Sequence, residues 1–284
     1  MSAASQDIFA EWSLPPGLTL GILLIAALYV RGWIAIRRTR SAYFTEGRLF
    51  CFLAGMAVLW FSVASPLDGF ADVLLSAHMV QHLMLMSVVP PLLLLGAPVV
   101  PLFRGLPAQV IKKIAGPLLA TAWVRRGADF FAQPVTAWIV FNLTFLGWHL
   151  PAAYDLALEH EKVHAFEHIC FLLTSILFWW VVLRPWPARR NSAGWMVLVY
   201  LLSADVVNTA LSAFLAFCNH IVYPYYSSGP NPFHVDPLAD QVLGAVIMWV
   251  LGSLVFLVPA MLLTVRMMEP QRGPARAAAG SLPS

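Results

Sequence analysis

Charged residues are scarce in this chain, and their scarcity excludes most classes of soluble protein. Only 11% of the 284 residues are Asp, Glu, Lys or Arg, whereas 60% are hydrophobic. A soluble globular domain carries about 25% charged residues, so this composition is typical of a polytopic membrane protein. The formal net charge of +3 gives no reason to expect a nucleic-acid partner, because short basic loops between membrane spans account for it.

Cysteine and the common enzyme motifs are also rare or missing. The chain has three cysteines, Cys51, Cys170 and Cys218, and no CxxC motif. An odd count without paired spacing argues against a disulfide framework and against a thiolate zinc site. The chain contains no GxSxG, no P-loop and no glycine-rich dinucleotide fingerprint. We therefore predict a protein that is not an enzyme.

Long apolar runs, by contrast, are abundant, and they predict an all-α polytopic membrane protein. A helix needs about 20 mostly apolar residues to cross a bilayer. We predict one bundle of transmembrane helices within residues 17–266, an external segment at 1–16 and a disordered cytoplasmic tail at 267–284. The seven expected spans lie near residues 17–36, 49–65, 74–97, 134–150, 163–183, 195–217 and 241–265.

The loops between these spans alternate in charge, which predicts the orientation of the chain. Basic residues follow the first, third, fifth and seventh spans, as at Arg37, Arg38, Arg104, Lys112, Arg184, Arg189, Arg190, Arg266 and Arg272. The alternate loops are acidic, as at Asp68, Asp72, Asp155, Glu159, Asp236 and Asp240. Short basic loops stay in the cytoplasm. We therefore expect the N-terminus outside and the C-terminus in the cytoplasm.

Two of the connections are long. The cytoplasmic loop 104–133 contains an amphipathic stretch, and we expect a short interfacial helix there that ends near Gly116 and Pro117. The external loop 218–240 is rich in Pro, Gly and Ser and is expected to form an irregular lid or a surface for a partner.

The histidines are all expected in the outer half of the bundle or outside the membrane. Four of them form two pairs, His78/His82 and His164/His168, each spaced i,i+4 in an apolar segment. This spacing places both imidazoles of a pair on one helix face. Polar side chains within a bilayer are costly and usually functional. The other histidines are His149, His160, His220 and His234.

This cluster of histidines predicts a metal site. Imidazole is a good ligand of copper, zinc and iron, and ligating histidines usually need a hydrogen-bond partner on the second ring nitrogen. The predicted ligands are His78, His82, His164, His168 and His149. The predicted supporting residues are His160, Glu167, Asp155, Gln81 and Met79. The alternative is that membrane histidines only form hydrogen bonds between helices, above all at His220 and His234.

Asp205 is a separate polar signal in the sixth predicted span. An isolated carboxylate at mid-bilayer is costly unless it is protonated or paired. One interpretation is a proton or ion relay, or a link from this span to the metal site. The other is a hydrogen-bond network with Asn208, Thr209 and Ser212 that fixes the packing of the helices.

Three stretches of this sequence resemble one known family. The first runs from His78-Met-Val-Gln-His82 through Pro90-Pro91 to Leu95-Gly96-Ala97-Pro98. The second is Trp148-His149-Leu150-Pro151, with Tyr154 and Asp155 after it, and the third joins His164, Glu167 and His168 to Phe178-Trp179-Trp180. Together they resemble the polytopic CtaG family, the caa3-type cytochrome c oxidase assembly factors.

The resemblance implies a multi-pass protein of the bacterial inner membrane that helps a haem-copper oxidase to mature. It implies an oxidase subunit as partner and copper as the metal. We hypothesise that the histidines bind copper at the outer leaflet and help to deliver it to the apo-oxidase, with an external copper donor docking on loop 218–240. Two alternatives stay open: a haem-binding membrane electron-transfer protein and a copper transporter.

Overall fold

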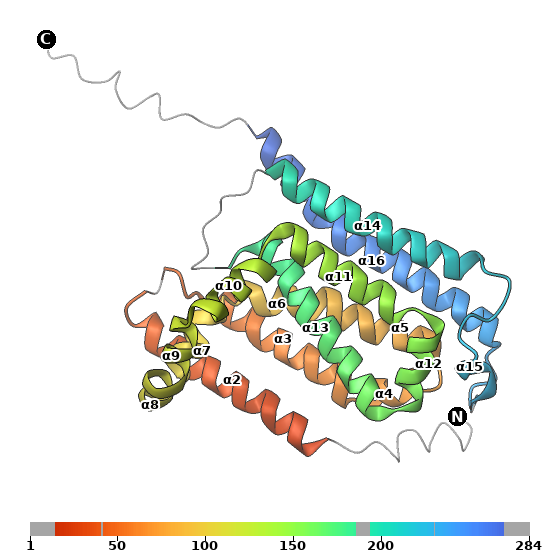
Figure 1. Cartoon of the computed structure of the whole chain (residues 1–284), viewed down its shortest axis with the longest axis horizontal. Coiled ribbons are helices and arrows are strands. Elements are labelled where there is room, and N and C mark those ends of the chain that lie inside the picture. Colours follow the sequence, from red (N-terminus) through yellow and green to blue (C-terminus); the bar gives the residue numbers. More distant parts are fainter. Residues whose placement is uncertain (1–14, 41, 186–193, 230, 270–284) are drawn as a thin grey trace, which may run out of the picture.

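The computed structural model describes residues 15–40, 42–185, 194–229 and 231–269. These residues form an elongated bundle of helices (Figure 1) and contain no strand. The predicted external segment 1–16 and tail 267–284 lie largely outside the described residues, as do Arg189, Arg190 and Arg272.

The helices match most of the predicted spans in position. The longer elements are α2 (Pro16–Arg37), α3 (Glu46–Ala64), α5 (Leu75–Leu83), η1 (Met84–Val88), α6 (Val89–Leu95), α11 (Pro134–Trp148), α13 (Glu161–Leu183), α14 (Gly194–Phe217) and α16 (Pro237–Met268). The shorter ones are α4 (Pro66–Ala71), α7 (Val99–Gly105), α8 (Ala108–Val110), η2 (Ile111–Ala115), α9 (Gly116–Ala120), α10 (Ala122–Phe131), α12 (Pro151–Glu159) and α15 (Tyr225–Ser228).

The number of spans is six or seven among the described residues. Six helical segments are long and apolar enough to cross a membrane, and α10 with α11 becomes a seventh only if this pair, bent by 71°, counts as one span. The bend coincides with Pro134, which stands at the start of α11. A residue before proline avoids helical backbone angles, and Gln133 is extended. The described residues are all-helical, as predicted.

A π-helical turn interrupts the third span at η1. Pro90 follows this turn, and a proline neither donates to the carbonyl four residues earlier nor leaves room for it. That carbonyl belongs to Met86, and Trp179 Nε1 on α13 donates a hydrogen bond to it at 3.0 Å. The Met86 carbonyl, which has lost its partner in the helix, thus attaches the third span to the fifth.

The bundle has two hydrophobic cores. The smaller lies around α2 and α3, where the rings of Tyr29 and Phe52 stack with centroids 3.7 Å apart. Tyr29 also donates a hydrogen bond to the Gly96 carbonyl at 2.7 Å. Close packing of α2 on α7 depends on glycine, because a Cβ at Gly32 would collide with the Pro101 carbonyl. The larger core joins α5, α11, α13, α14 and α16.

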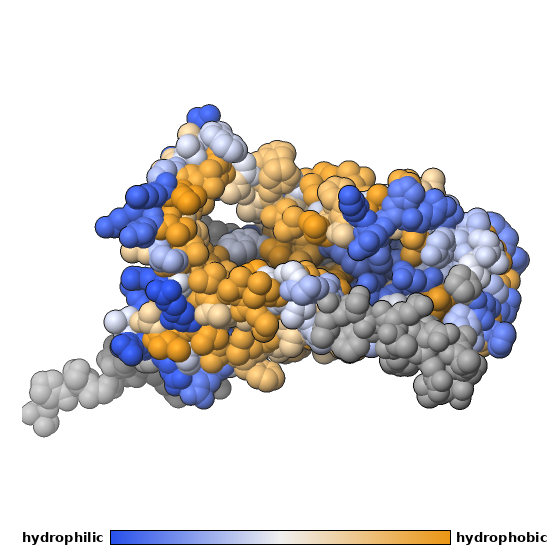
Figure 2. All heavy atoms as spheres, turned by 90° about the horizontal axis from the view of Figure 1, so that it is seen from below, coloured by the Kyte–Doolittle hydropathy of each residue, from blue (hydrophilic) through white to orange (hydrophobic). Residues whose placement is uncertain are grey.

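The outer surface of the bundle is strongly apolar. Large side chains such as Phe50 and Val135 are exposed, and Figure 2 shows an apolar stretch between more hydrophilic ends. Contiguous exposed apolar surface on this scale suits contact with lipid rather than water. Helices α14 and α16 run side by side along one edge of the bundle, and α2 lies at the opposite edge (Figure 1).

Both long connections are more ordered than predicted. The helical path through loop 104–133 continues past Gly116 and Pro117, so the predicted helix end there is wrong. The wide turn of η2 precedes Pro117, as the wide turn of η1 precedes Pro90, so each proline follows a π turn within a continuing helical path. In loop 218–240 the chain forms α15, and α16 begins at Pro237 with Asp236 capping Ala239 N at 3.0 Å.

Candidate metal site

The pair His78/His82 on α5 and the pair His164/His168 on α13 form two histidine ladders, which face each other. The centroids of the His78 and His164 rings are 5.2 Å apart, and those of His82 and His168 are 5.6 Å apart. Each i,i+4 pair therefore presents both rings to the opposite pair. The third and fifth predicted spans are neighbours, as a shared site requires.

His149 joins the cluster from the end of α11. Its ring centroid is 6.3 Å from that of His82. The C-terminal position of His149 on α11 brings it to the level of the ladders. All five predicted ligands thus lie in one contiguous group of imidazoles.

Four side chains bring potential ligand atoms closest together. One such atom from each of His78, His82, His164 and Glu167 lies within 4.8 Å of the others. The Nε2 atoms of His78 and His82 are 2.8 Å apart, and Glu167 Oε1 is 3.7 Å from His82 Nε2. Glu167 is only 1% exposed. A buried carboxylate among imidazoles is a donor set that fits a cation.

Many polar atoms of this cluster have no hydrogen-bond partner within the described part of the chain. Buried polar groups in folded proteins are nearly always hydrogen-bonded, and each unpaired one destabilises the fold by about 1–3 kcal/mol. These atoms are therefore available to a ligand or to water. The atoms are His82 Nδ1, His149 Nε2, His164 Nε2, His168 Nε2 and both carboxylate oxygens of Glu167.

The hydrogen bonds of His78 fix which of its nitrogens is free to bind. The Tyr226 hydroxyl donates to the Ala71 carbonyl at 2.9 Å, so it accepts at 3.2 Å from His78 Nδ1. His78 Nε2 is then left as a lone-pair donor directed at His82. His149 has the same arrangement, because its Nδ1 donates to the Phe145 carbonyl at 2.7 Å. A second ring nitrogen held in this way is usual for metal-binding histidines.

Tyrosines cover the outer end of the cluster, and the sequence interpretation missed them. Tyr154 of α12 lies with its ring centroid 5.0 Å from His78 and 4.1 Å from Tyr223. Tyr223 donates a hydrogen bond to the His149 carbonyl at 3.1 Å. Burial raises the pKa of Tyr223 and Tyr226, so both stay protonated and uncharged. Three tyrosines within residues 223–226 were the available signal.

Two residues near the start of α16 hold the tyrosine-rich segment and the start of α5 in place, and they too were missed. Asp240 Oδ2 accepts from Leu75 N at 2.6 Å, and Oδ1 accepts from Ser76 N at 3.3 Å, which satisfies free N–H groups at the start of α5. Gln241 Oε1 accepts from Val222 N at 2.8 Å. The first ladder and the tyrosine loop are therefore both attached to α16.

The predicted supporting residues have different positions. Gln81 donates to Ser62 O at 2.8 Å and to Asp68 Oδ1 at 2.6 Å, so its amide is used to attach α4. Burial raises the pKa of Asp68, and this hydrogen bond opposes that rise. Asp155 lies beside α15. Burial raises its pKa, and a hydrogen bond with the Tyr225 backbone opposes part of that rise. Met79 is buried next to the cluster, in a pocket shared with His82.

Asp205 is half-buried on α14 and is not one of the four residues with clustered ligand atoms. The contacts from α14 to α16 come instead from its neighbours. Asn208 Nδ2 donates to the Met248 carbonyl at 3.3 Å, and the hydroxyls of Thr209 and Ser253 are 3.5 Å apart. These contacts fit the packing network weighed above for this stretch, without Asp205.

An HExxH motif, which the sequence interpretation missed, overlaps the second ladder as His160-Glu161-Lys162-Val163-His164. On a helix, this motif holds zinc through both histidines and supplies a glutamate base in metalloproteases. Here His160 has extended backbone angles and precedes α13, and both His160 and Glu161 are exposed. Only His164 belongs to the four-residue group. The structure therefore does not form the metalloprotease arrangement.

The remaining two histidines lie in loop 218–240. His220 is exposed and contacts Cys218 Sγ through Nδ1 at 3.3 Å. His234 is exposed and has left-handed backbone angles, with φ of 52°. Neither belongs to the cluster of imidazoles.

Comparison with known proteins identifies relatives over most of the chain. The family described as cytochrome c oxidase caa3 assembly factor (Caa3_CtaG) matches residues 27–270. The uncharacterized proteins Mb0105 of Mycobacterium bovis and ML1998 of Mycobacterium leprae are each 27% identical, over 87% and 85% of this chain. The chain spans only about 40% and 37% of their lengths. No solved structure matches significantly.

Proposed function

Since this chain belongs to the cytochrome c oxidase caa3 assembly factor family, we propose that it binds copper at the histidine cluster and passes it to an oxidase subunit. In this proposal copper is cargo. The protein itself supplies a donor set that can take up the ion and release it.

The observation that carries this proposal is the set of four ligand atoms within 4.8 Å, from His78, His82, His164 and Glu167. Imidazole nitrogens bind copper well, and a carboxylate adds compensating charge. His168 adds a further imidazole one helical turn below His164. The unpaired nitrogens and oxygens around this point support a bound cation, because a cation would give them a partner.

The type of ligand also suits transfer. No cysteine belongs to the four-residue group, and a closed thiolate cage would hold copper too tightly for handover. An incoming ligand of the oxidase subunit can displace imidazoles one at a time. A surplus of histidines around the four closest groups allows such exchange without leaving the ion unligated.

The charge pattern of the loops favours a position of this site near the external face. With the N-terminus outside, α12 and α15 lie on the outer side, and both are at the same end of the bundle as α4 and α5 (Figure 1). An oxidase subunit and an external copper donor would then dock over loop 218–240, in the inner membrane of a bacterium. A site buried under this loop favours handover on the outside over transport.

Haem is disfavoured by the packing of the two ladders. A bis-imidazole haem needs two histidines on opposite faces of the macrocycle. The facing rings here lie 5.2 and 5.6 Å apart between centroids. In addition, the two rings of each ladder come from one helix face and would approach the same face of a macrocycle.

Copper titration of the purified protein tests the proposal. His164→Ala removes one of the four closest ligand groups, whereas His160→Ala removes an exposed imidazole one turn away and serves as the matched control. We expect His164→Ala to weaken Cu(II) binding by at least about tenfold and His160→Ala to leave it unchanged. Equal binding by both variants and the natural chain would overturn the assignment.

A further inference from the structure

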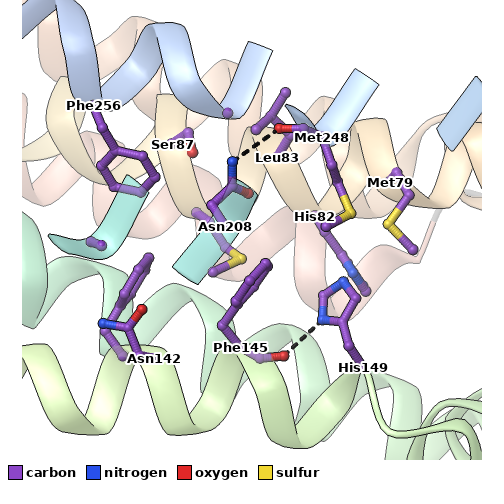
Figure 3. A pocket seen from close by; sticks show the side chains of 14 residues that line it. Met79, His82, Leu83, Ser87, Asn142, Phe145, His149, Asn208, Met248 and Phe256 are labelled. Atoms are coloured by element: carbon purple, nitrogen blue, oxygen red, sulfur yellow. Dashed lines mark hydrogen bonds between the residues drawn. The ribbon is translucent and has the colours of Figure 1, made fainter. Parts of the chain in front are cut away.

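A second enclosed space lies inward of the histidine cluster. Its lining includes both His82 and His149, and it continues between α5, η1, α11, α14 and α16 (Figure 3). The cavity volume is about 30 Å³. A space of that size holds about one water molecule or one ion.

This cavity contains polar atoms that lack a partner. His149 Nε2, His82 Nδ1 and Asn142 Oδ1 are buried and unpaired among the residues that the structure describes. All three side chains line the cavity and are at most 5% exposed. The Nδ1 bond of His149 to the Phe145 carbonyl leaves a lone pair on Nε2. An apolar packing gap would leave no such atoms unsatisfied.

Thioethers make up much of the remaining lining. Met79, Met86 and Met248 come from α5, η1 and α16, and all are buried. Figure 3 shows the sulfur atoms of Met79 and Met248 on the same side of the cavity as the His82 and His149 rings. Helix α16 approaches Met79 closely because residue 244 is glycine, where a Cβ would lie 3.2 Å from Met79 Cγ.

We propose that this cavity is a second metal site, which holds one soft monovalent cation such as Cu(I). Its ligands are His149 Nε2 and the thioethers of Met79 and Met248. This inference rests on the proposed function, because it divides the copper cargo between two neighbouring sites. Thioether sulfur prefers Cu(I), whereas imidazole with carboxylate also suits Cu(II).

The division gives His149 a role apart from the ladders. The His149 ring centroid lies 6.3 Å from that of His82, and His149 is absent from the four-residue group. Its free nitrogen belongs to a cavity whose lining also offers the thioethers of Met79, Met86 and Met248. No charged side chain lines this cavity, which favours a monovalent over a divalent ion.

The test uses Ag(I), a redox-stable probe for Cu(I), with the full chain in detergent. We compare Met79→Leu/Met248→Leu with Met84→Leu, a control on the same span whose side chain does not line the cavity. Leucine conserves volume and apolar character. We expect the double variant to bind one Ag(I) at least about tenfold more weakly, and the control to match the natural chain. X-ray absorption should show silver–sulfur scattering that the double variant loses.

Two further measurements keep the outcomes distinct. Cu(II) titration of Met79→Leu/Met248→Leu should match the natural chain, because the outer ligands are intact, and an unchanged melting temperature confirms the fold. Unchanged Ag(I) affinity in the double variant, or silver without sulfur neighbours, overturns the second site. A third outcome is that the double variant loses Ag(I) binding while the natural chain does not bind Cu(II). This outcome overturns the proposed function and leaves the second site standing.

Discussion

The Tyr226 hydroxyl accepts a hydrogen bond from Nδ1 of His78 at 3.2 Å, across 148 positions of the sequence. This contact joins loop 218–240 to the first histidine ladder. It fixes the imidazole with Nε2 toward His82, so the loop takes part in shaping the ligand set as well as covering it. Since Tyr226 also donates to the Ala71 carbonyl, its orientation is determined from two sides.

Removal of this hydroxyl should weaken metal binding without unfolding the protein. Tyr226→Phe keeps the ring and loses the acceptor for His78 Nδ1. Loss of such an outer partner typically costs about 10–100-fold in metal affinity. Isothermal titration with Cu(II) measures this loss, and Tyr225→Phe on the same short helix is the control. Equal affinities for the two variants would show that Tyr226 does not orient His78.

Asp240 should be one of the most important residues for stability outside the cores. In Asp240→Ala the backbone N–H groups of Leu75 and Ser76 lose their buried acceptor, which costs about 1–3 kcal/mol for each unsatisfied group. Asp240→Asn keeps one acceptor oxygen and should recover much of the loss. In thermal unfolding in detergent, the melting temperature should fall in the order natural chain, Asn variant, Ala variant. Any other order contradicts the capping role.

The π turn of the third span should depend on Trp179. Trp179→Phe removes the indole N–H that satisfies the Met86 carbonyl and should lower stability by about 1–3 kcal/mol. Trp180→Phe, the next position on the same helix, is the comparison. A similar loss in both variants would mean that ring volume, and not the hydrogen bond, matters at this position.

Bound copper should stabilise the protein, and a chelator should reverse the effect. A ligand that binds only the folded state at a concentration of 100 Kd adds about 2.7 kcal/mol of stability. The melting temperature should therefore rise with Cu(II) and return after chelation in the natural chain. In His78→Ala the rise should be much smaller, and an undiminished rise would place the stabilising site elsewhere.

The sequence predicted the helices well because length and hydropathy determine membrane spans. The ends of α2, α13 and α14 lie within a few residues of the expected spans. The fourth predicted span is too short to cross a membrane alone. Helix α11 has 15 residues, about 22 Å of helix, whereas the hydrocarbon core is about 30 Å thick. The bend before Pro134 decides how that span is counted, and hydropathy carries no information on it.

The site was predictable only where its signal was local. The spacing of His78/His82 and of His164/His168 gave the faces of two helices, and the structure brings those faces together. Tyr226 and Asp240 could not be found in that way, because their partners lie about 150 positions away and depend on tertiary packing. The separate environment of His149 likewise emerges only when α11, α14 and α16 meet.

Copper stoichiometry of the purified 284-residue chain tests the central claim most directly. Elemental analysis after loading with Cu(II) and removal of free metal should give about one copper per natural chain. The variant His78→Ala/His164→Ala, which removes one ligand from each ladder, should retain close to none while keeping its helical circular dichroism. A natural chain that stays metal-free, or a folded double variant that still holds one copper, would contradict the account.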